Sequence, residues 1–462
     1  MGAEPPPADD AAPKLTDFNW PNYSVRRFDE DYRGLADLAS IPARDRADEL
    51  KFLPLNDERS IWFSLGGQAR WRYKGFNDFN FGAPARDDDS FYFLHRYFLW
   101  GDLHLGDQVR VFVELKSALS HDRDLPGGQR TLDEDEFDLQ NAFAEFRAPN
   151  DLSEELDWLV RFGRQELLYG KQRLVSPLDW SNTRRTWDGV VGRVADDGWS
   201  LDAFYTRFVP VQKYDFNERD DDYDFWGVYT TWQDIRPRLN ADFYLLGQHL
   251  ENLPTGDIDR YTLGARAFGS IGKNGYAYDF ESAWQFGDAG AADIKAWFVA
   301  TELSWSDPEL ESKPWIALGF DYASGDENPA DGESGSFNAL FPLGHAYLGY
   351  IDVVGRSNII DARLSGRINP TEKLWLRADW HNFWRAEAAD ALYNAGGGIV
   401  RAGGAGTDRW VGMEFDFTAG YTFDRHWSAL VGYSHFFAGD FLADTGASSD
   451  IDFWYTQLQF TF

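Results

Sequence analysis

Apolar and polar residues alternate with a period of two along most of the chain after residue 60. This period is typical of a β-strand, whose successive side chains point to opposite faces. In the clearest stretches, 108–119, 238–248 and 413–421, one face is almost wholly apolar and the other carries charged or amide side chains. The pattern predicts about eighteen strands, at residues 61–77, 90–105, 108–121, 136–148, 156–169, 184–194, 198–209, 222–233, 237–249, 258–271, 275–287, 293–306, 313–324, 357–369, 373–386, 407–422, 426–438 and 450–462.

The connections between these strands alternate between short and long. QDIRP, INPTEK and YTFDRH are tight turns, whereas 121–135, 324–356 and 387–406 are long loops rich in acidic residues or glycine. A transmembrane β-barrel of the outer-membrane type has this asymmetry, with short periplasmic turns and long extracellular loops. A soluble β-sandwich has no reason to sort its connections in this way. We therefore expect an all-β protein, a transmembrane antiparallel β-barrel of about eighteen strands.

The composition agrees with a membrane barrel. Aromatic residues reach 17%, with 20 Trp, 21 Tyr and 37 Phe, while the mean hydropathy is -0.49. No run of about twenty apolar residues exists, so a transmembrane helix is excluded, and aromatic girdles are typical of barrel interfaces. The last strand, DFWYTQLQFTF, is similar to the C-terminal strand of bacterial outer-membrane proteins, which ends in Phe. The expected location is the bacterial outer membrane.

The N-terminal part of the chain has a different pattern. Residues 1 to about 14 are rich in Pro, Ala and Asp, a composition typical of disorder. A short helical pattern follows between about Gly34 and Lys51. We expect residues 1–55 to form a periplasmic segment, partly disordered and with a short helix, and residues 56–462 to form the barrel.

The stretch QARWRYK places Arg70, Arg72 and Lys74 at every second position. A Lys or Arg that faces lipid near the bilayer midplane costs about 2–4 kcal/mol, so these cations are expected to face the lumen. The alternation breaks near 161–173 and 184–193, so faces there are not fixed by it. The basic residues expected along the substrate path are Arg70, Arg72, Lys74, Arg96, Arg110, Lys116, Arg161, Arg185, Arg266, Arg363, Arg367 and Arg377. The acidic residues expected in the lumen are Asp102, Glu114, Asp188, Asp242, Asp361 and Asp379.

Two interpretations of this charged wall remain open. In the first, salt bridges between strands make the wall rigid and no ligand is involved. In the second, the cations lower the energy of an anion that passes them. The first three strands favour the second interpretation locally, because they supply six cations against Asp102 and Glu114 although the whole chain has a net charge of -32. So many ionisable groups also predict a water-filled pore rather than a packed interior.

Two further segments carry a resemblance to a known family. RFGRQELLYGKQRLVSPLDWSNTRRTWDGV (161–190) and the region LGFDYASGDENPADG to LGYIDVVG (318–355) resemble the alginate-export family of outer-membrane proteins. The resemblance extends over nearly the whole chain from about residue 16. It implies a monomeric eighteen-stranded barrel, an electropositive constriction that passes a secreted, acetylated polyuronate, and loops that close the pore at rest. The implied partners are alginate, outer-membrane lipid or lipopolysaccharide, and a periplasmic secretion machinery, with no nucleic acid.

The expected function is therefore that of a porin that exports the anionic polysaccharide alginate passively through an electropositive pore. One alternative is an uptake porin for small organic anions, and another is a soluble β protein that acts on polyuronates. An enzyme is not expected, because no HExxH motif is present and adjacent pairs such as Ser434 and His435 point to opposite faces of a strand.

Two loops carry additional hypotheses. The loop 121–135 is long enough to enter the lumen, where Arg123 and Arg130 would join a gate. The acidic run Asp220, Asp221 and Asp222 could bind a structural Ca²⁺ at an external loop, although a solvated charge run is the commoner case. No other metal and no cofactor is expected, since Cys is absent and the 8 His form no metal-binding motif.

Overall fold

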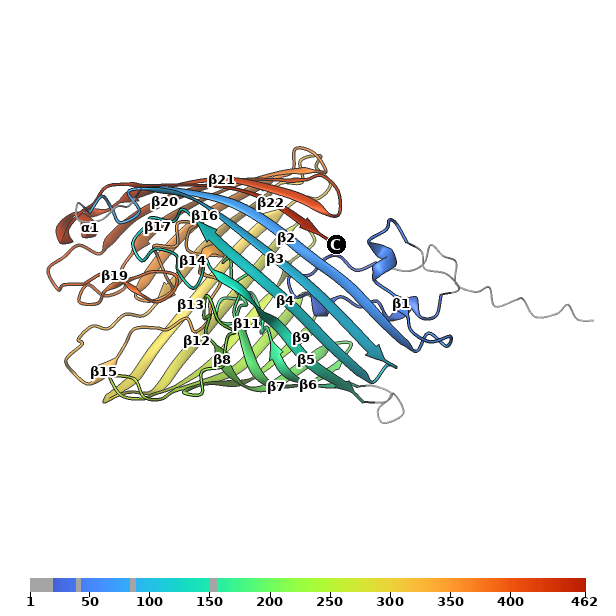
Figure 1. Ribbon diagram of the computed structural model, residues 1–462. Coiled ribbons are helices and arrows are strands. Elements are labelled where there is room, and N and C mark those ends of the chain that lie inside the picture. Colours follow the sequence, from blue (N-terminus) through green and yellow to red (C-terminus); the bar gives the residue numbers. More distant parts are fainter. Residues whose placement is uncertain (1–19, 39–42, 84–88, 149–155) are drawn as a thin grey trace, which may run out of the picture.

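The computed structural model describes residues 20–38, 43–83, 89–148 and 156–462. In this part of the chain, eighteen antiparallel strands form a closed β-barrel (Figure 1). Successive wall strands pair with each other, and β2 (Ile61–Asn77) closes the barrel by pairing with β22 (Ile451–Thr461). The predicted fold class is confirmed.

Every predicted strand is present within a few residues of its expected bounds. The largest difference is at β6, which ends at Gln165 because Glu166 and Leu167 turn inward and are buried. The other wall strands are β3 (Ser90–Leu105), β4 (Val109–His121), β5 (Asp135–Arg147), β6 (Asp157–Gln165), β7 (Thr186–Asp196), β8 (Trp199–Val209), β9 (Tyr223–Arg236), β10 (Leu239–Leu250), β11 (Ile258–Ile271), β12 (Tyr276–Ala289), β13 (Ala292–Ser306), β14 (Trp315–Ala323), β16 (Ile359–Ile368), β17 (Leu374–Trp384), β20 (Trp410–Thr422) and β21 (Trp427–Ala438).

The two ends of the barrel differ in the length of their connections. Tight turns such as 197–198 and 237–238 lie at one end, here called the turn end, together with the C-terminus (Figure 1). Long connections such as 166–185 and 324–358 leave the opposite end, here called the loop end. Minor elements add to the wall strands or the loops: β1 (Leu53–Pro54), β15 (Glu333–Ser334), η5 (Gly344–Ala346), β18 (Leu392–Tyr393), β19 (Ile399–Arg401) and α1 (Asp440–Thr445).

The N-terminal segment lies against the turn end of the barrel (Figure 1). The short helix expected between about residues 34 and 51 is not found among the described residues of the segment, which form only the 3-10 turns η1 (Arg27–Asp29), η2 (Arg33–Leu35) and η3 (Asp48–Leu50). A proline at position 42, inside the predicted helix, removes a backbone donor and disfavours helical geometry before it. The disorder expected for residues 1–14 lies outside the described residues. No helix in the described part of the chain has both the length and the apolar character to cross a membrane.

Aromatic packing holds the N-terminal segment in place. The segment and the turn-end wall share one buried apolar cluster, formed by Phe28, Tyr32, Leu35, Leu38, Phe52, Trp62, Trp100, Phe112 and Phe143. Burying an aromatic side chain of this size contributes about 1.5–3 kcal/mol. The segment is therefore a packed part of the structure over its described residues, 20–38 and 43–52.

The lumen is not the open water-filled pore that the charged wall predicted. Loops 166–185 and 324–358 fold inward, where Leu174, Val175, Phe341 and Leu348 are buried against wall residues of the largest apolar cluster. Val175 forms a backbone bridge with Phe341, so the two loops also contact each other. The prediction failed because strand periodicity fixes the faces of the wall but carries no information on where a long loop packs.

Candidate functional site

A cluster of arginines lies where β2 meets loop 166–185. Arg70 and Arg72 project from β2 into the lumen, as predicted, and each is 2% exposed. Arg70 Nη1 donates to Asp179 O at 2.7 Å, and Arg72 Nη1 donates to Trp180 O at 2.6 Å. Among the described residues, neither guanidinium forms an ion pair with a carboxylate; their partners are backbone carbonyls and one glutamine. Positive charge is therefore held inside the lumen without neutralisation at these two positions.

Asp179 is the carboxylate at the centre of this cluster. Arg96 Nη2 lies 2.7 Å and Arg184 Nη1 3.2 Å from Asp179 Oδ1, and Arg184 Nη2 also donates to Glu166 Oε2 at 2.5 Å. Burial raises the pKa of Asp179, but the charges of Arg96, Arg184 and Arg70 outweigh burial and hold this pKa well below its usual range. Together with both arginines of β2, four guanidinium groups lie around two directly paired carboxylates, Asp179 and Glu166.

Three of the predicted cations on the other side of the barrel, Arg266, Arg363 and Arg377, are neutralised. Arg266 pairs with Asp242 at 2.9 Å, and the same pattern recurs along the wall. The other pairs are Arg266 with Asp279, Arg363 with Glu302, and Arg377 with Asp379. On this side of the barrel, the charges are accounted for by the first interpretation, in which salt bridges between strands make the wall rigid.

The remaining predicted residues lie outside this cluster and contact other partners. Four of the pairs are Arg110 with Asp102, Lys116 with Asp135, Arg161 with Glu145 and Asp188 with Arg164. The other contacts are Arg185 with Pro342 O, Arg367 with Asn369, Glu114 with Asn141 and Asp361 with His381. The structure thus brings only Arg70, Arg72 and Arg96 of the predicted path into one cluster.

The loop end contains a cavity of about 360 Å³, here called the loop-side cavity. The side chain of Lys74 lines this cavity. Lys74 lies on the same face of β2 as Arg72, two residues further along the strand. Arg123 and Arg130 also line it, and both pair with Asp133, at 3.3 and 2.7 Å. These two arginines therefore lie beside the cavity rather than in the cluster around Asp179, and their role in a gate remains a prediction.

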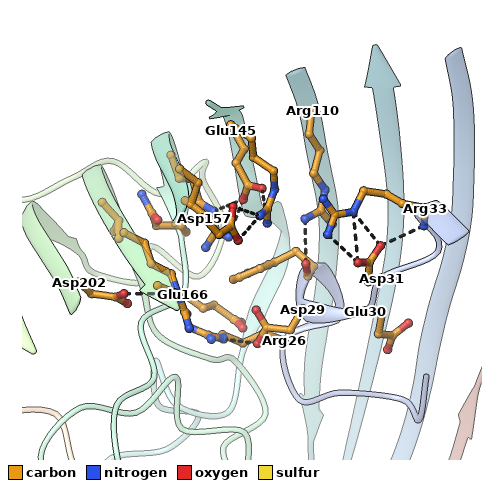
Figure 2. Close-up of a pocket in the computed structure, with 18 of the residues that line it drawn as sticks. Arg26, Asp29, Glu30, Asp31, Arg33, Arg110, Glu145, Asp157, Glu166 and Asp202 are labelled. Atoms are coloured by element: carbon orange, nitrogen blue, oxygen red, sulfur yellow. Dashed lines mark hydrogen bonds and ion pairs between the residues drawn. The ribbon is translucent and has the colours of Figure 1, made fainter. Parts of the chain in front are cut away.

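A second cavity of about 460 Å³ lies at the turn end, here called the turn-side cavity (Figure 2). Figure 2 shows Arg26, Asp29 and Arg33 of the N-terminal segment facing Arg110 and Glu145 of the wall. The segment is fixed to the wall and to loop 166–185 by backbone contacts, because Phe28 O accepts from Arg110 and Val25 O from Arg184. The N-terminal segment thus covers part of the turn-side mouth and contacts the loop that carries the arginine cluster.

Four residues of the site were missed from the sequence: Glu166, Asp179, Trp180 and Arg184. Glu166 and Arg184 belong to the two stretches in which the alternation breaks, Asp179 and Trp180 lie between these stretches, and the breaks were the available signal. A strand pattern that stops inside a run of charged and aromatic residues indicates chain that has left the wall. It does not indicate which wall residues the chain will meet.

The external acidic run gives no support to a calcium site. Asp221 pairs with Arg207 and with Arg219, and Asp220 accepts the Asp222 backbone N–H. Across the described residues, no group of three His, Asp or Glu side chains is arranged to hold a metal ion.

Comparison with known proteins adds independent information. The family model described as alginate export matches residues 61–456. No curated protein matches the chain. Among solved structures, OccD3 (OpdP) of Pseudomonas aeruginosa is similar with a TM-score of 0.59 at 13% identity, covering 87% of this chain and 91% of that one. OccAB1 of Acinetobacter baumannii gives 0.56 at 14% identity, with coverages of 86% and 96%. OprD of Pseudomonas aeruginosa gives 0.55 at 13%, with coverages of 86% and 93%.

The closed eighteen-stranded barrel and its charged lumen define an outer-membrane porin, a transport fold rather than an enzymatic one. The location in the outer membrane follows from the same observations. Since the family model covers the barrel from the first wall strand into the last, the chain belongs to the alginate export family.

Proposed function

We propose that this porin exports alginate, or a closely similar polyuronate, from the periplasm across the outer membrane. The observation that carries the proposal is the cluster around Asp179, where four guanidinium groups outnumber two carboxylates. An arginine fork binds a carboxylate through two parallel hydrogen bonds, and each sugar of a polyuronate presents a carboxylate. Family membership supports the choice of polymer.

The mechanism is passive. In this structure Arg70 and Arg72 donate hydrogen bonds to backbone carbonyls of loop 166–185. Once the loop moves, a sugar carboxylate would replace these carbonyls as the acceptor. Passage requires several weak sites rather than one tight site, because a polymer must leave each site as readily as it binds. The N-terminal segment lies at the turn end, which is the periplasmic end of an outer-membrane barrel. A periplasmic secretion machinery would deliver the polymer there, and lipopolysaccharide would surround the loop end.

Ion selectivity in planar bilayers tests the role of the cluster. We expect the porin to prefer anions despite its net charge of -32, and the double variant Arg70→Glu, Arg72→Glu to lose or reverse this preference. Arg219→Glu with Arg238→Glu is the matched control, because it changes the net charge equally at exposed positions outside the lumen. Cation preference in the original protein would overturn the proposal.

Uptake of small organic anions is the second candidate, favoured by the sizes of the cavities, about 360 and 460 Å³. A deletion strain separates the two functions. Export predicts the loss of secreted polymer with normal growth on small carboxylates, and uptake predicts the reverse.

A further inference from the structure

Lys74 is a buried cation to which the described residues offer no carboxylate partner. It is 8% exposed, and within the described part of the chain it makes no hydrogen bond and no ion pair that would neutralise its ammonium group. Its nearest defined contacts are aromatic: Nζ lies 4.8 Å from the centre of the Trp180 ring and 5.8 Å from that of Phe453. A buried ammonium group without a carboxylate partner is poorly solvated, so an anion that reached it would be bound favourably.

The acidic residues near Lys74 are already engaged. Asp133 pairs with Arg130 at 2.7 Å and with Arg123 at 3.3 Å. Asp352 contacts His345 Nδ1 at 3.3 Å. Neither carboxylate forms an ion pair with Lys74 in this arrangement.

The loop-side cavity gives the ammonium group room for a ligand. Its volume of about 360 Å³ lies within the ~300–1,000 Å³ range of small-molecule sites. Aromatic side chains supply much of the lining, among them Phe79, Tyr92 and Tyr350. Apolar ring surface with a few charged groups suits a sugar ring that carries one anionic substituent.

Trp180 has a positioning role rather than a stacking role. His345 stacks on its ring at 3.8 Å, and the Arg72 guanidinium lies over the ring at 3.8 Å. These contacts occupy the Trp180 ring and place it between the arginine cluster and the cavity. Lys74 is thus the next cation that a chain leaving Arg72 would meet.

We propose that the loop-side cavity is a binding subsite for a uronate, in which the Lys74 ammonium group holds the sugar carboxylate. The proposal rests on the export function, since it assigns the ligand of the cavity that follows the arginine cluster. It goes further by predicting a site that binds short uronate oligomers without transport.

Calorimetry with trimannuronate and the full chain in detergent tests the subsite. Lys74→Gln is expected to weaken binding by about tenfold or more, because it removes a charge-assisted contact, while Lys74→Arg retains it. Lys171→Gln is the matched control, since Lys171 is a lysine of loop 166–185 that is already paired, with Glu302 at 3.3 Å. Equal affinity of the original protein and Lys74→Gln would overturn the proposal.

Two comparisons with the unmodified protein identify the ligand. A neutral trisaccharide of mannose is expected not to bind, which would show that the carboxylate is required. Sulfate or chloride that displaced trimannuronate at equal concentration would show a general anion site and overturn the assignment to a uronate.

Carbodiimide coupling gives a second readout that does not depend on a variant folding. The reagent activates the carboxyl group of trimannuronate, the Lys74 amine forms an amide with it, and the reagent leaves as a urea. Mass spectrometry is expected to find the adduct on Lys74, and adducts confined to other lysines would contradict the subsite. Because binding is measured in detergent, loss of the Lys74 site and failure of export in cells are separate results.

Discussion

Asp179 limits the positive charge of the arginine cluster, because it is the carboxylate shared by Arg96 and Arg184. We expect Asp179→Asn to increase the anion preference of the channel, since the cluster then carries one more net positive charge. The barrel should also unfold at a lower temperature, because like charges are less compensated. Reversal potentials and heat-modifiable gel mobility measure the two effects. Asp221→Asn, at an exposed loop, is the control, and an unchanged reversal potential in Asp179→Asn would contradict this role.

At the scale of single residues, the sequence predicted which wall cations face the lumen but not which groups they contact. The lipid penalty on charged side chains placed Arg70, Arg72 and Lys74 in the lumen, and the structure buries all three. The partners of these residues were not predictable, because Asp179 and Trp180 lie on a loop whose position depends on tertiary packing. Whether a given lumenal cation is paired with a carboxylate could therefore be determined only from the structure.

Loop 324–358 is held to the wall by a contact that only glycine permits. Gly349 has φ +91, and a Cβ there would lie 2.5 Å from the Glu414 carboxylate, which accepts a hydrogen bond from Ile351 N at 2.9 Å. We expect Gly349→Ala to displace the loop, at a cost of about 1–3 kcal/mol from backbone conformation alone, and to raise single-channel conductance.

Gly332 provides the control for that substitution. It lies on the same loop with φ +85, but an added Cβ would meet open space. Gly332→Ala therefore carries the backbone penalty without the clash against the wall. Equal conductance of the two variants would show that the contact with Glu414 does not hold the loop in the lumen.

The N-terminal segment depends on pH through Asp45, which contacts Arg425 and His426 of the turn between β20 and β21. The hydrogen bond from Arg425 holds the pKa of Asp45 well below its usual value of 3.8. A carboxyl with a lowered pKa stabilises the docked segment above its unfolded pKa, and that contribution is lost as the pH falls below about 3.8.

Hydrogen exchange of residues 43–52, corrected for intrinsic rates, measures this dependence. We expect exchange to accelerate as the pH falls below about 3.8, and to be fast already at neutral pH in Arg425→Gln. Lys295→Gln, which removes an exposed ion pair with Glu333 near the loop end, should leave the profile unchanged. A profile in Arg425→Gln like that of the original protein would show that apolar packing alone fixes the segment.

Across the whole molecule, the barrel was predictable and its contents were not. A closed wall with lipid outside imposes a period of two on every strand, so the eighteen strands could be located from the alternation of residues. The loops that fill the lumen carry apolar residues such as Phe341 and Leu348, and nothing in their local pattern distinguishes inward packing from an external position.

The turn-side mouth leads to a prediction at this scale. Because residues 20–38 and 43–52 cover part of the mouth and contact loop 166–185, a chain that begins at residue 53 should show larger and noisier single-channel conductance. Recordings in planar bilayers at one salt concentration measure the difference. Conductance identical to that of the full chain would show that the loops alone close the path.

The buried Arg27 has a consequence for the order of assembly. Its guanidinium donates to Phe462 O at 3.1 Å and to Gly67 O at 3.3 Å, and these two residues pair with each other where the last strand meets the first. The two acceptors lie side by side only once the two ends of the sheet have joined. This contact of the segment therefore forms only on a closed barrel, and it marks a sheet whose first and last strands have paired.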